Sequence, residues 1–442
     1  YEALNSEERL TQPMIKQGGE WKTVDWQTAL EYVANGLKQI KDQHGANSIG
    51  ALVSPHSTLE ELFLTGQLLR GIGSDNIDWR LRHAQFNAAE GVRWLGTSIA
   101  ALSELQAALV VGSNLRKDHP LFAQRIRQAT KKGCQVFALN AKVYDWAMPV
   151  AASVVAAQDW AQALADVAAA VAAAKGVQAP VAGQANAEAQ AIANALLAGE
   201  RKAVLLGNAA AHHAQAAQLL ALANWIGAQT GATVGYLTEA ANTVGAQWVK
   251  AQPQANGLNA AQMIAGGLKA AILLNNEPAF DSAAGQQALQ GLNKSEMVVT
   301  LSPFKANMEI SDVLLPIAPF TETSGTFVNA EGRVQSFHAV VKPLAETRPA
   351  WKVLRVLANL LGVQGFDYDS SQDVLATAIG AATTEVPAQV LSNATQLAVQ
   401  VNAGAVAEPA VASIYELDSI VRRAPSLQLT ADARLARQGG AA

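Results

Sequence analysis

The sequence predicts an α/β protein in which two parallel-sheet halves each carry helices on both faces. The first observation is a set of short apolar runs without polar alternation, bounded by Gly, Ser and Asn, as in strands buried on both faces of a parallel sheet. The second is that segments of helical periodicity separate these runs, which is the order of a βαβ series. The third is that the series restarts after an alanine-rich interval, so we expect two Rossmann-like halves. The predicted strands lie in 48–54, 107–114 and 134–141 of the first series and in 202–208, 270–279 and 296–303 of the second.

The elements follow one another in a definite order along the chain. Pro13 and the Gly18-Gly19 turn lie in an extended stretch with alternating residues, which predicts a short hairpin. Asp25 then precedes apolar residues at helical spacing, so it is expected to cap a helix that ends at Gly45. The predicted segments are an N-terminal hairpin or extension (1–24), a first Rossmann-like half (25–160), an Ala-rich connecting segment (161–200), a second Rossmann-like half (201–316), a hairpin and helix (317–362), and a C-terminal Ala-rich segment and tail (363–442).

A second hairpin is predicted near the C-terminus of the second half, within the polar stretch FTETSGTFVNAEGRVQ (320–335). Asn329 opens the expected turn and Gly332 closes it, which suits a three-residue loop with glycine in the left-handed conformation. The polar side chains of this stretch fit either a hairpin turn with solvated polar groups or a loop that binds a ligand.

Composition limits the class of protein. The chain has 442 residues, half of them apolar and 15% charged, which allows two or three domains with large cores. A net charge of −4 gives no general attraction for nucleic acid. Cys134 is the single cysteine, so it is expected to be a small core residue, and this chain alone cannot hold a disulfide framework or a cysteine-ligated cluster. No apolar run reaches the roughly 18 residues of a bilayer span, and no signal peptide is recognisable. The start at Tyr1 leads us to expect a functional region upstream.

Common catalytic and binding motifs are not matched. Gly71-Ile72-Gly73 lacks the third glycine of a dinucleotide fingerprint, and no GxxxxGK[ST] stretch occurs. Adjacent His212 and His213 would point about 100° apart on a helix, so they could not easily bind one metal. Since no two of the seven histidines have useful ligand spacing with a carboxylate, the sequence predicts no protein-held metal.

Polar residues recur where the predicted strands end. In open α/β sheets ligands bind outside the carboxyl ends of the strands, so these residues predict a pocket. The alternative is that they close βα turns and cap helices. The residues are Ser54, His56, Gly112, Ser113, Asn114, Asn140, Asn208, Asn275, Asn276 and Glu277.

Three stretches resemble the molybdopterin oxidoreductases. They are RLTQPMIKQGGEWKTVDWQTALEYVA, VVGSNLRKDHPLFAQRIRQATKKGCQVFALN and FTETSGTFVNAEGRVQSFHAVVKPLAETRPAWKVLRVLANLLG. The resemblance covers residues 8–362 and implies formate dehydrogenase-like domains. Two stretches, SNLRKDHPLFAQRIRQA and IYELDSIVRRAPSLQLTADA, look like a narrower group. That group is the large iron–sulphur subunit of bacterial NADH-quinone oxidoreductase, respiratory complex I.

The resemblance implies where a pterin-dinucleotide would lie between the two halves. Gly112, Ser113 and Asn114 match the loop beneath one nucleotide portion, and Asn275 and Glu277 match the equivalent loop of the second half. The stretch that closes over the pterin in that family matches a segment that contains Glu322, Asn329 and Arg333.

One departure from the family pattern affects the metal. Active members carry a Cys, selenocysteine or Ser just before a His, whereas the matching stretch here places Arg82 before His83. A guanidinium is a permanent cation without a lone pair to donate, so Arg82 cannot bind molybdenum. Asp78 is the remaining oxygen donor nearby. We therefore expect a vestigial pocket in which Glu322, Asn329 and Arg333 bond to the protein itself, and we expect no molybdopterin.

The resemblance implies a non-catalytic scaffold portion of a complex I subunit, inactive by itself, in a complex that transfers electrons from NADH to quinone. The iron–sulphur clusters are then expected in the upstream region, and the partners are other peripheral-arm subunits on the cytoplasmic side of the bacterial inner membrane. Arg422 and Arg423 either contact those partners or form a solvated helix end. The alternatives are an active molybdopterin-dependent oxidoreductase, with Arg82 or Asp78 in place of the usual ligand, and a nucleotide-binding module.

Overall fold

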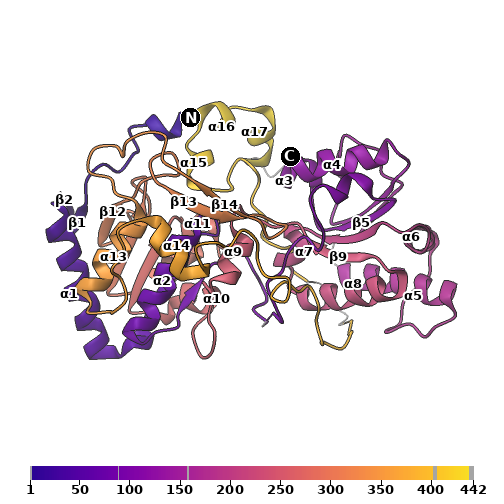
Figure 1. Ribbon diagram of the computed structural model, residues 1–442, viewed down its shortest axis with the longest axis horizontal. Helices are drawn as coiled ribbons and strands as arrows, with labels where there is room; N and C mark the ends of the chain where they lie inside the picture. Colours follow the sequence, from indigo (N-terminus) through magenta and orange to yellow (C-terminus); the bar gives the residue numbers. More distant parts are fainter. Residues whose placement is uncertain (1, 88, 157–158, 402–405, 438–442) are drawn as a thin grey trace.

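The computed structural model describes residues 2–87, 89–156, 159–401 and 406–437, and it has the α/β architecture that the sequence predicts. Two sheets, here called the large sheet and the small sheet, lie in neighbouring lobes, with the C-terminal helices above the junction (Figure 1). The large sheet has the order β2 (Glu20–Thr23), β1 (Met14–Gln17), β12 (Val313–Pro316), β11 (Met297–Ser302), β10 (Ala270–Leu274), β3 (Ile49–Val53), β4 (Ile77–Asp78). The small sheet has the order β7 (Ala152–Val155), β6 (Gln135–Asn140), β5 (Ala107–Val111), β8 (Lys202–Leu206), β9 (Thr233–Tyr236).

Helices cover both faces of the large sheet. Strands β12, β11, β10, β3 and β4 run parallel, while β1 is antiparallel to both of its neighbours. Ala51 and Ile272 pair in register and lie in the cluster with α1, whereas the adjacent Leu52 and Leu273 lie in the cluster on the opposite face. Such fully buried strands read as continuous apolar runs, which is why the sequence predicts them. One face carries α1 (Trp26–His44), α2 (Leu59–Ile72) and α13 (Ala350–Leu360); the other carries α10 (Ala260–Gln262), a π-turn (Met263–Gly267) and α12 (Gln287–Leu292).

The small sheet is entirely parallel and is covered in the same way. Leu109 pairs with Val204 and faces the alanine-rich helices, while Val110 and Leu205 face the other side. The predicted Ala-rich helices are therefore confirmed as the cover of one face. This face carries α5 (Trp160–Lys175), α6 (Ala187–Leu197) and α8 (Ala216–Thr230); the other carries α4 (Pro120–Thr130) and a 3₁₀ turn (Ala101–Glu104).

The sheets do not divide the chain into the two sequential halves (25–160 and 201–316) that the sequence predicts. Strand β3 of the first predicted half pairs with β10 of the second, and β5 pairs with β8. The small sheet is an insertion between β4 and β10 of the large sheet. The boundary was wrong because apolar patterning identifies a buried strand without identifying its hydrogen-bonded neighbour.

The first predicted hairpin and helix are confirmed. Strands β1 and β2 pair through the Gly18-Gly19 turn, and the Thr28 amide donates to Asp25 Oδ1 at 2.8 Å, which caps α1. Strands β4, β7, β9 and β12 were not predicted. They contain two to four residues. The hairpin strands β1, β2, β13 and β14 are equally short, but turn residues such as Gly18-Gly19 and Gly332 indicated them.

The second predicted hairpin is also confirmed, between β13 (Gly325–Val328) and β14 (Val334–Phe337). The Asn329 amide donates to the Arg333 carbonyl at 3.0 Å, which leaves a three-residue loop. Gly332 closes this loop with φ +90°, a conformation that disfavours residues with a Cβ.

The remaining helices are short, and several belong to the C-terminal segment. Among the described residues, no helix combines the length and the apolar character needed to cross a bilayer. The remaining short helices are α3 (Leu115–Asp118), α7 (Asn208–His212), α9 (Thr243–Trp248), α11 (Pro278–Asp281), α14 (Ser371–Ile379), α15 (Ser419–Arg422), α16 (Pro425–Gln428) and α17 (Ala431–Arg437), with 3₁₀ turns at Ala3–Asn5 and Ala46–Ser48.

Two buried carboxyl groups lie at the start of α2, and that of Glu60 joins this helix to the second hairpin. Glu60 accepts hydrogen bonds from the Thr326 amide (2.9 Å) and hydroxyl (2.7 Å), and Glu61 accepts one from the Thr58 amide at 3.0 Å. Burial raises the pKa of each carboxyl to about 7, although the hydrogen bonds oppose the shift.

This environment predicts a pH dependence of stability. The folded-state pKa of Glu60 lies above the unfolded value of 4.5, so stability is fully present below pH 4.5 and falls as pH rises through 7. From pH 5 to 8 the wild type should lose on the order of 1–3 kcal/mol relative to Glu60→Gln. Urea unfolding of both proteins at several pH values measures this. Glu31→Gln, on the exposed face of α1, should follow the wild type; a Glu60→Gln curve parallel to the wild type would contradict the assignment.

Candidate functional site

The candidate site lies where the carboxyl ends of the two sheets approach each other. The chain crosses from the large to the small sheet after β4 and returns after β9. His83, on the first crossing, contacts His212 after β8 and Glu239 after β9. The polar residues predicted from the strand ends are distributed over more than one group.

Arg82 is held by an ion pair. Its side chain is 10% exposed, and Nη2 donates to Asp281 Oδ1 at 2.8 Å and to the Phe280 carbonyl at 3.3 Å. Asp281 ends α11, which follows β10 of the large sheet. The nearby Asp78 is fully buried and binds the Arg80 guanidinium with both carboxylate oxygens, at 2.8 and 2.9 Å.

The C-terminal segment extends this ion pair into a network. Arg422 donates to both oxygens of Asp281, each at 3.0 Å, and to Glu277 at 3.1 Å. Arg423 forms two further bonds to Glu277, at 2.7 and 3.0 Å, and one to Glu8 at 2.8 Å. Arg422 and Arg423 therefore bind this chain's own strand ends. This corrects the expectation that they form a solvated helix end, since their side chains are only 8% and 11% exposed.

Gly112, Ser113 and Asn114 line a separate cavity of about 400 Å³ at the carboxyl end of β5. The Ser113 amide donates to Asn140 Oδ1 at 2.9 Å, and a Cβ on Gly112 would lie 2.4 Å from the Ala210 amide nitrogen. Residues 408–416 of the C-terminal segment line the other side of this cavity. The loop at Gly112–Asn114 thus borders a cavity, and the C-terminal segment covers it.

The other predicted site residues bond to the protein at three separate places. Asn275 Nδ2 donates to Ser57 Oγ at 3.1 Å, and Glu322 binds Arg9 with both oxygens, at 2.8 and 2.9 Å. Asn329 Oδ1 accepts from the Arg333 amide at 2.9 Å within their own turn. The Arg333 side chain is 59% exposed, and its Nε lies 3.7 Å from Glu331.

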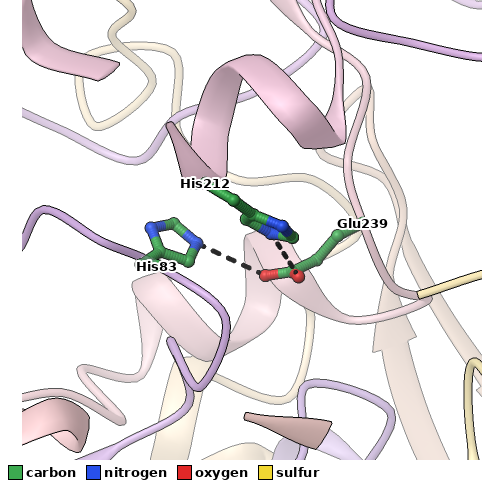
Figure 2. Close-up of side chains that lie close together, drawn as sticks. All are labelled: His83, His212 and Glu239. Atoms are coloured by element: carbon green, nitrogen blue, oxygen red, sulfur yellow. Dashed lines mark hydrogen bonds and ion pairs between the residues drawn. The ribbon is translucent and has the colours of Figure 1, made fainter. Parts of the chain in front are cut away.

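The third group of polar side chains comprises His83, His212 and Glu239, whose ligand-type atoms all lie within 4.8 Å of one another. Figure 2 shows both imidazoles directed at the carboxylate. His212 Nε2 lies 2.7 Å from Glu239 Oε2, and His83 Nε2 lies 3.5 Å from Glu239 Oε1. Burial opposes ionisation of Glu239, but the imidazoles, His212 foremost, hold the pKa of this carboxyl well below its usual value.

Sequence reasoning missed His212 and Glu239, because it searched for ligand spacing within one segment. The three residues come from separate segments that meet only in the folded chain. Recognition of β9 would have placed Glu239 at a strand end, beside the other predicted positions. The first residue of the set, His83, was predicted from the family resemblance alone.

Known proteins similar in sequence are oxidoreductases by name. Probable oxidoreductase YjgC of Bacillus subtilis (strain 168) is 26% identical over 455 residues, covering 85% of this chain and 45% of the relative. NADPH-Fe(3+) oxidoreductase subunit alpha of Geobacter sulfurreducens is 28% identical over 441 residues, covering 82% of this chain and 50% of the relative. The chain spans about half the length of these relatives.

Two solved structures share the fold. Acetylene hydratase from Pelobacter acetylenicus superposes with a TM-score of 0.64 at 15% identity, over 87% of this chain and 66% of that one. A chain of the formyltransferase/hydrolase complex from Methylorubrum extorquens gives 0.56 at 17% identity, over 79% of this chain and 98% of that one. Both TM-scores support a common fold. This confirms the predicted formate dehydrogenase-like architecture.

The family assignment comes from the sequence itself. Residues 9–360 match the molybdopterin oxidoreductase family, in agreement with the range over which the resemblance extends. This match includes both sheets, both crossings and the second hairpin. The chain belongs to the molybdopterin oxidoreductase family.

Proposed function

We propose that this chain is a non-catalytic scaffold portion of a bacterial oxidoreductase of the NADH-quinone oxidoreductase (complex I) type. The observation that carries the proposal is the Arg82–Asp281 ion pair, at the position where the resemblance places the metal ligand. Electron transfer from NADH to quinone would then be a property of the whole complex. The iron–sulphur clusters would be held outside this chain, since Cys134 is its single thiol.

The donor set argues against a bound molybdopterin. Arg82 offers no lone pair and carries a charge that repels a metal cation. Asp78 already binds Arg80 with both carboxylate oxygens and accepts from the Ala260 amide at 3.0 Å. Glu277, at the matched loop of the large sheet, is bonded to Arg422 and Arg423. A molybdopterin therefore does not fit these residues, and we derive no chemistry through it.

The narrower assignment to complex I rests on the resemblance of two stretches of the sequence, and these two stretches pack against each other in the fold. Lys117 of the first stretch forms an ion pair with Asp432 of the second and lies 5.7 Å from the Tyr415 ring centroid. Tyr415 Oη also donates to Asp432 at 3.3 Å. We propose peripheral-arm subunits as partners, and the cytoplasmic side of the inner membrane as the location.

A metal and pterin assay of the natively purified protein tests this proposal. We expect the tagged chain to co-purify with NADH-oxidising, quinone-reducing activity, and to contain neither molybdenum nor tungsten at stoichiometric level by elemental analysis. Pterin fluorescence should be absent after acid oxidation. Stoichiometric molybdenum or tungsten together with a pterin would instead establish an active molybdopterin enzyme.

Nucleotide binding is the second candidate function, favoured by the cavity of about 400 Å³ at Gly112–Asn114. The same preparation distinguishes it. A nucleotide released in stoichiometric amount on denaturation, without molybdenum or tungsten, would favour a nucleotide-binding module over a pure scaffold.

A further inference from the structure

The His83–His212–Glu239 group occupies a position that joins the two sheets. His83 lies on the crossing that leaves the large sheet, while His212 ends α7 and Glu239 follows β9 of the small sheet. Two neutral imidazoles and a carboxylate are the protein ligands found in His₂Glu zinc sites. None of them is used in the scaffold function proposed above.

The spacing of the two imidazole rings fits one shared ion. Two imidazoles bound through Nε2 to one tetrahedral Zn²⁺ place their ring centroids about 5 Å apart, given Zn–N of about 2 Å. The rings of His83 and His212 have centroids 5.0 Å apart with planes at 51°. Glu239 presents one oxygen to each ring, so either oxygen can complete a set of three ligands.

A hydrogen bond from Nδ1 to the main chain fixes the tautomer and the orientation of His212. Its Nδ1 lies 2.8 Å from the Ala410 carbonyl, which can only accept, so Nδ1 carries a proton and Nε2 faces Glu239. Metal-binding histidines are characteristically oriented by such a bond from the other ring nitrogen. Nε2 of His212, on the opposite side of the ring, lies 2.7 Å from Glu239 Oε2 and is the atom available to a metal ion.

The surroundings provide space and polar groups for a bound ion. A cavity of about 110 Å³ borders His83 and Glu239, and Thr238, Thr243 and Gln247 add polar groups to its wall. Arg80 and Arg93 also line it; the bidentate bond to Asp78 offsets the charge of Arg80, and the Arg93 guanidinium lies over the Tyr236 ring, 5.4 Å from its centroid. The cavity gives the ion an open position that a water molecule can occupy.

We infer that His83, His212 and Glu239 form a binding site for a divalent transition-metal ion of the Zn²⁺ class, with a fourth position open to the cavity. The bound ion connects the two crossings and, through Ala410, the C-terminal segment. The inference is independent of the scaffold role, because within the described part of the chain the three proposed ligands form no bond with the Arg82–Asp281 ion pair, and the site requires no molybdopterin.

Metal titration of the full chain tests the inference. After chelator treatment and removal of any affinity tag, the protein should bind one Zn²⁺ per chain at micromolar concentration, measured by equilibrium dialysis. Glu239→Gln or His212→Ala should weaken this binding at least about 100-fold, because loss of a ligand exceeds the 10–100-fold effect of an outer-shell partner. Zn²⁺ should also raise the thermal midpoint of the wild type and not that of these variants.

His213→Gln is the matched control. His213 adjoins His212 and is equally buried, but it packs on Trp160 with ring centroids 5.2 Å apart, away from Glu239. This variant should keep the Zn²⁺ site. Binding that survives in Glu239→Gln and His212→Ala would overturn the inference, since the ion would then occupy another site.

Cobalt spectroscopy provides a measurement on the wild type that does not depend on the folding of any variant. One equivalent of Co²⁺ should produce the visible d–d bands of a four-coordinate site, and Zn²⁺ should abolish them. A spectrum of hexa-aqua Co²⁺ only, with no saturable Zn²⁺ binding, would mean that the three side chains form an ion pair and nothing more.

Discussion

Replacing Asp281 with alanine is expected to lower the free energy of unfolding by on the order of 3–5 kcal/mol. The carboxylate binds two buried guanidinium groups, those of Arg82 and Arg422, and its removal leaves both with reduced compensation. A buried cation that loses its partner cannot recover its hydration. The free energy of unfolding therefore falls by more than it does when a surface ion pair is removed. Urea unfolding measures the loss, and limited proteolysis should show earlier cleavage beside Arg422.

The control for Asp281→Ala is an ion pair of the same chemical type at the surface. Glu104 binds Lys132, and both side chains are more than half exposed. Glu104→Ala should leave the unfolding midpoint unchanged within error. If Asp281→Ala behaved in the same way, the network would contribute nothing to holding the C-terminal segment.

Replacing Glu322 with alanine is expected to have a comparable effect, on the order of 3–5 kcal/mol. Arg9 forms a bidentate pair with Glu322 and also donates to the Pro303 carbonyl at 3.2 Å, and its side chain is 2% exposed. The pair fastens the N-terminal stretch to the start of the second hairpin. Chemical unfolding of the single variants Arg9→Met and Glu322→Ala measures each loss.

A double-mutant cycle separates the pair from its surroundings. The double variant Arg9→Met with Glu322→Ala should be more stable than the sum of the two single losses predicts, because it leaves no unpaired buried charge. Exposed Glu296, which binds Lys269, provides the control, and its alanine variant should be neutral. Strict additivity of the Arg9 and Glu322 variants would show that the two side chains act separately.

The sequence predicted those parts of the fold that local chemistry determines. Continuous apolar runs identified the central strands, Asp25 identified the start of α1, and Gly332 identified the hairpin loop. The pairing of strands could not be predicted in this way. Ala51 pairs with Ile272 across the whole insertion, and neither residue's neighbours in sequence indicate this partner.

The same distinction between local chemistry and long-range pairing explains why only part of the candidate site was predicted. Strand ends can be read from the sequence, so Gly112 and Glu277 were predicted correctly as residues of the carboxyl edges. The partners of Glu277 could not be predicted, since Arg422 lies far along the chain and nothing in its own stretch of sequence indicates this contact. His83, His212 and Glu239 likewise come together only through the crossings between the sheets.

The insertion of one sheet into the other sets an order for folding during synthesis. All strands of the small sheet lie within residues 107–236, so this sheet can close while the large sheet still lacks β10, β11 and β12. Until β10 has been synthesised, β3 has β4 as its only neighbour in the large sheet and its other edge is unpaired. The segment with Arg422 and Arg423 follows both sheets in the sequence, so it binds across their carboxyl ends as a late step of assembly.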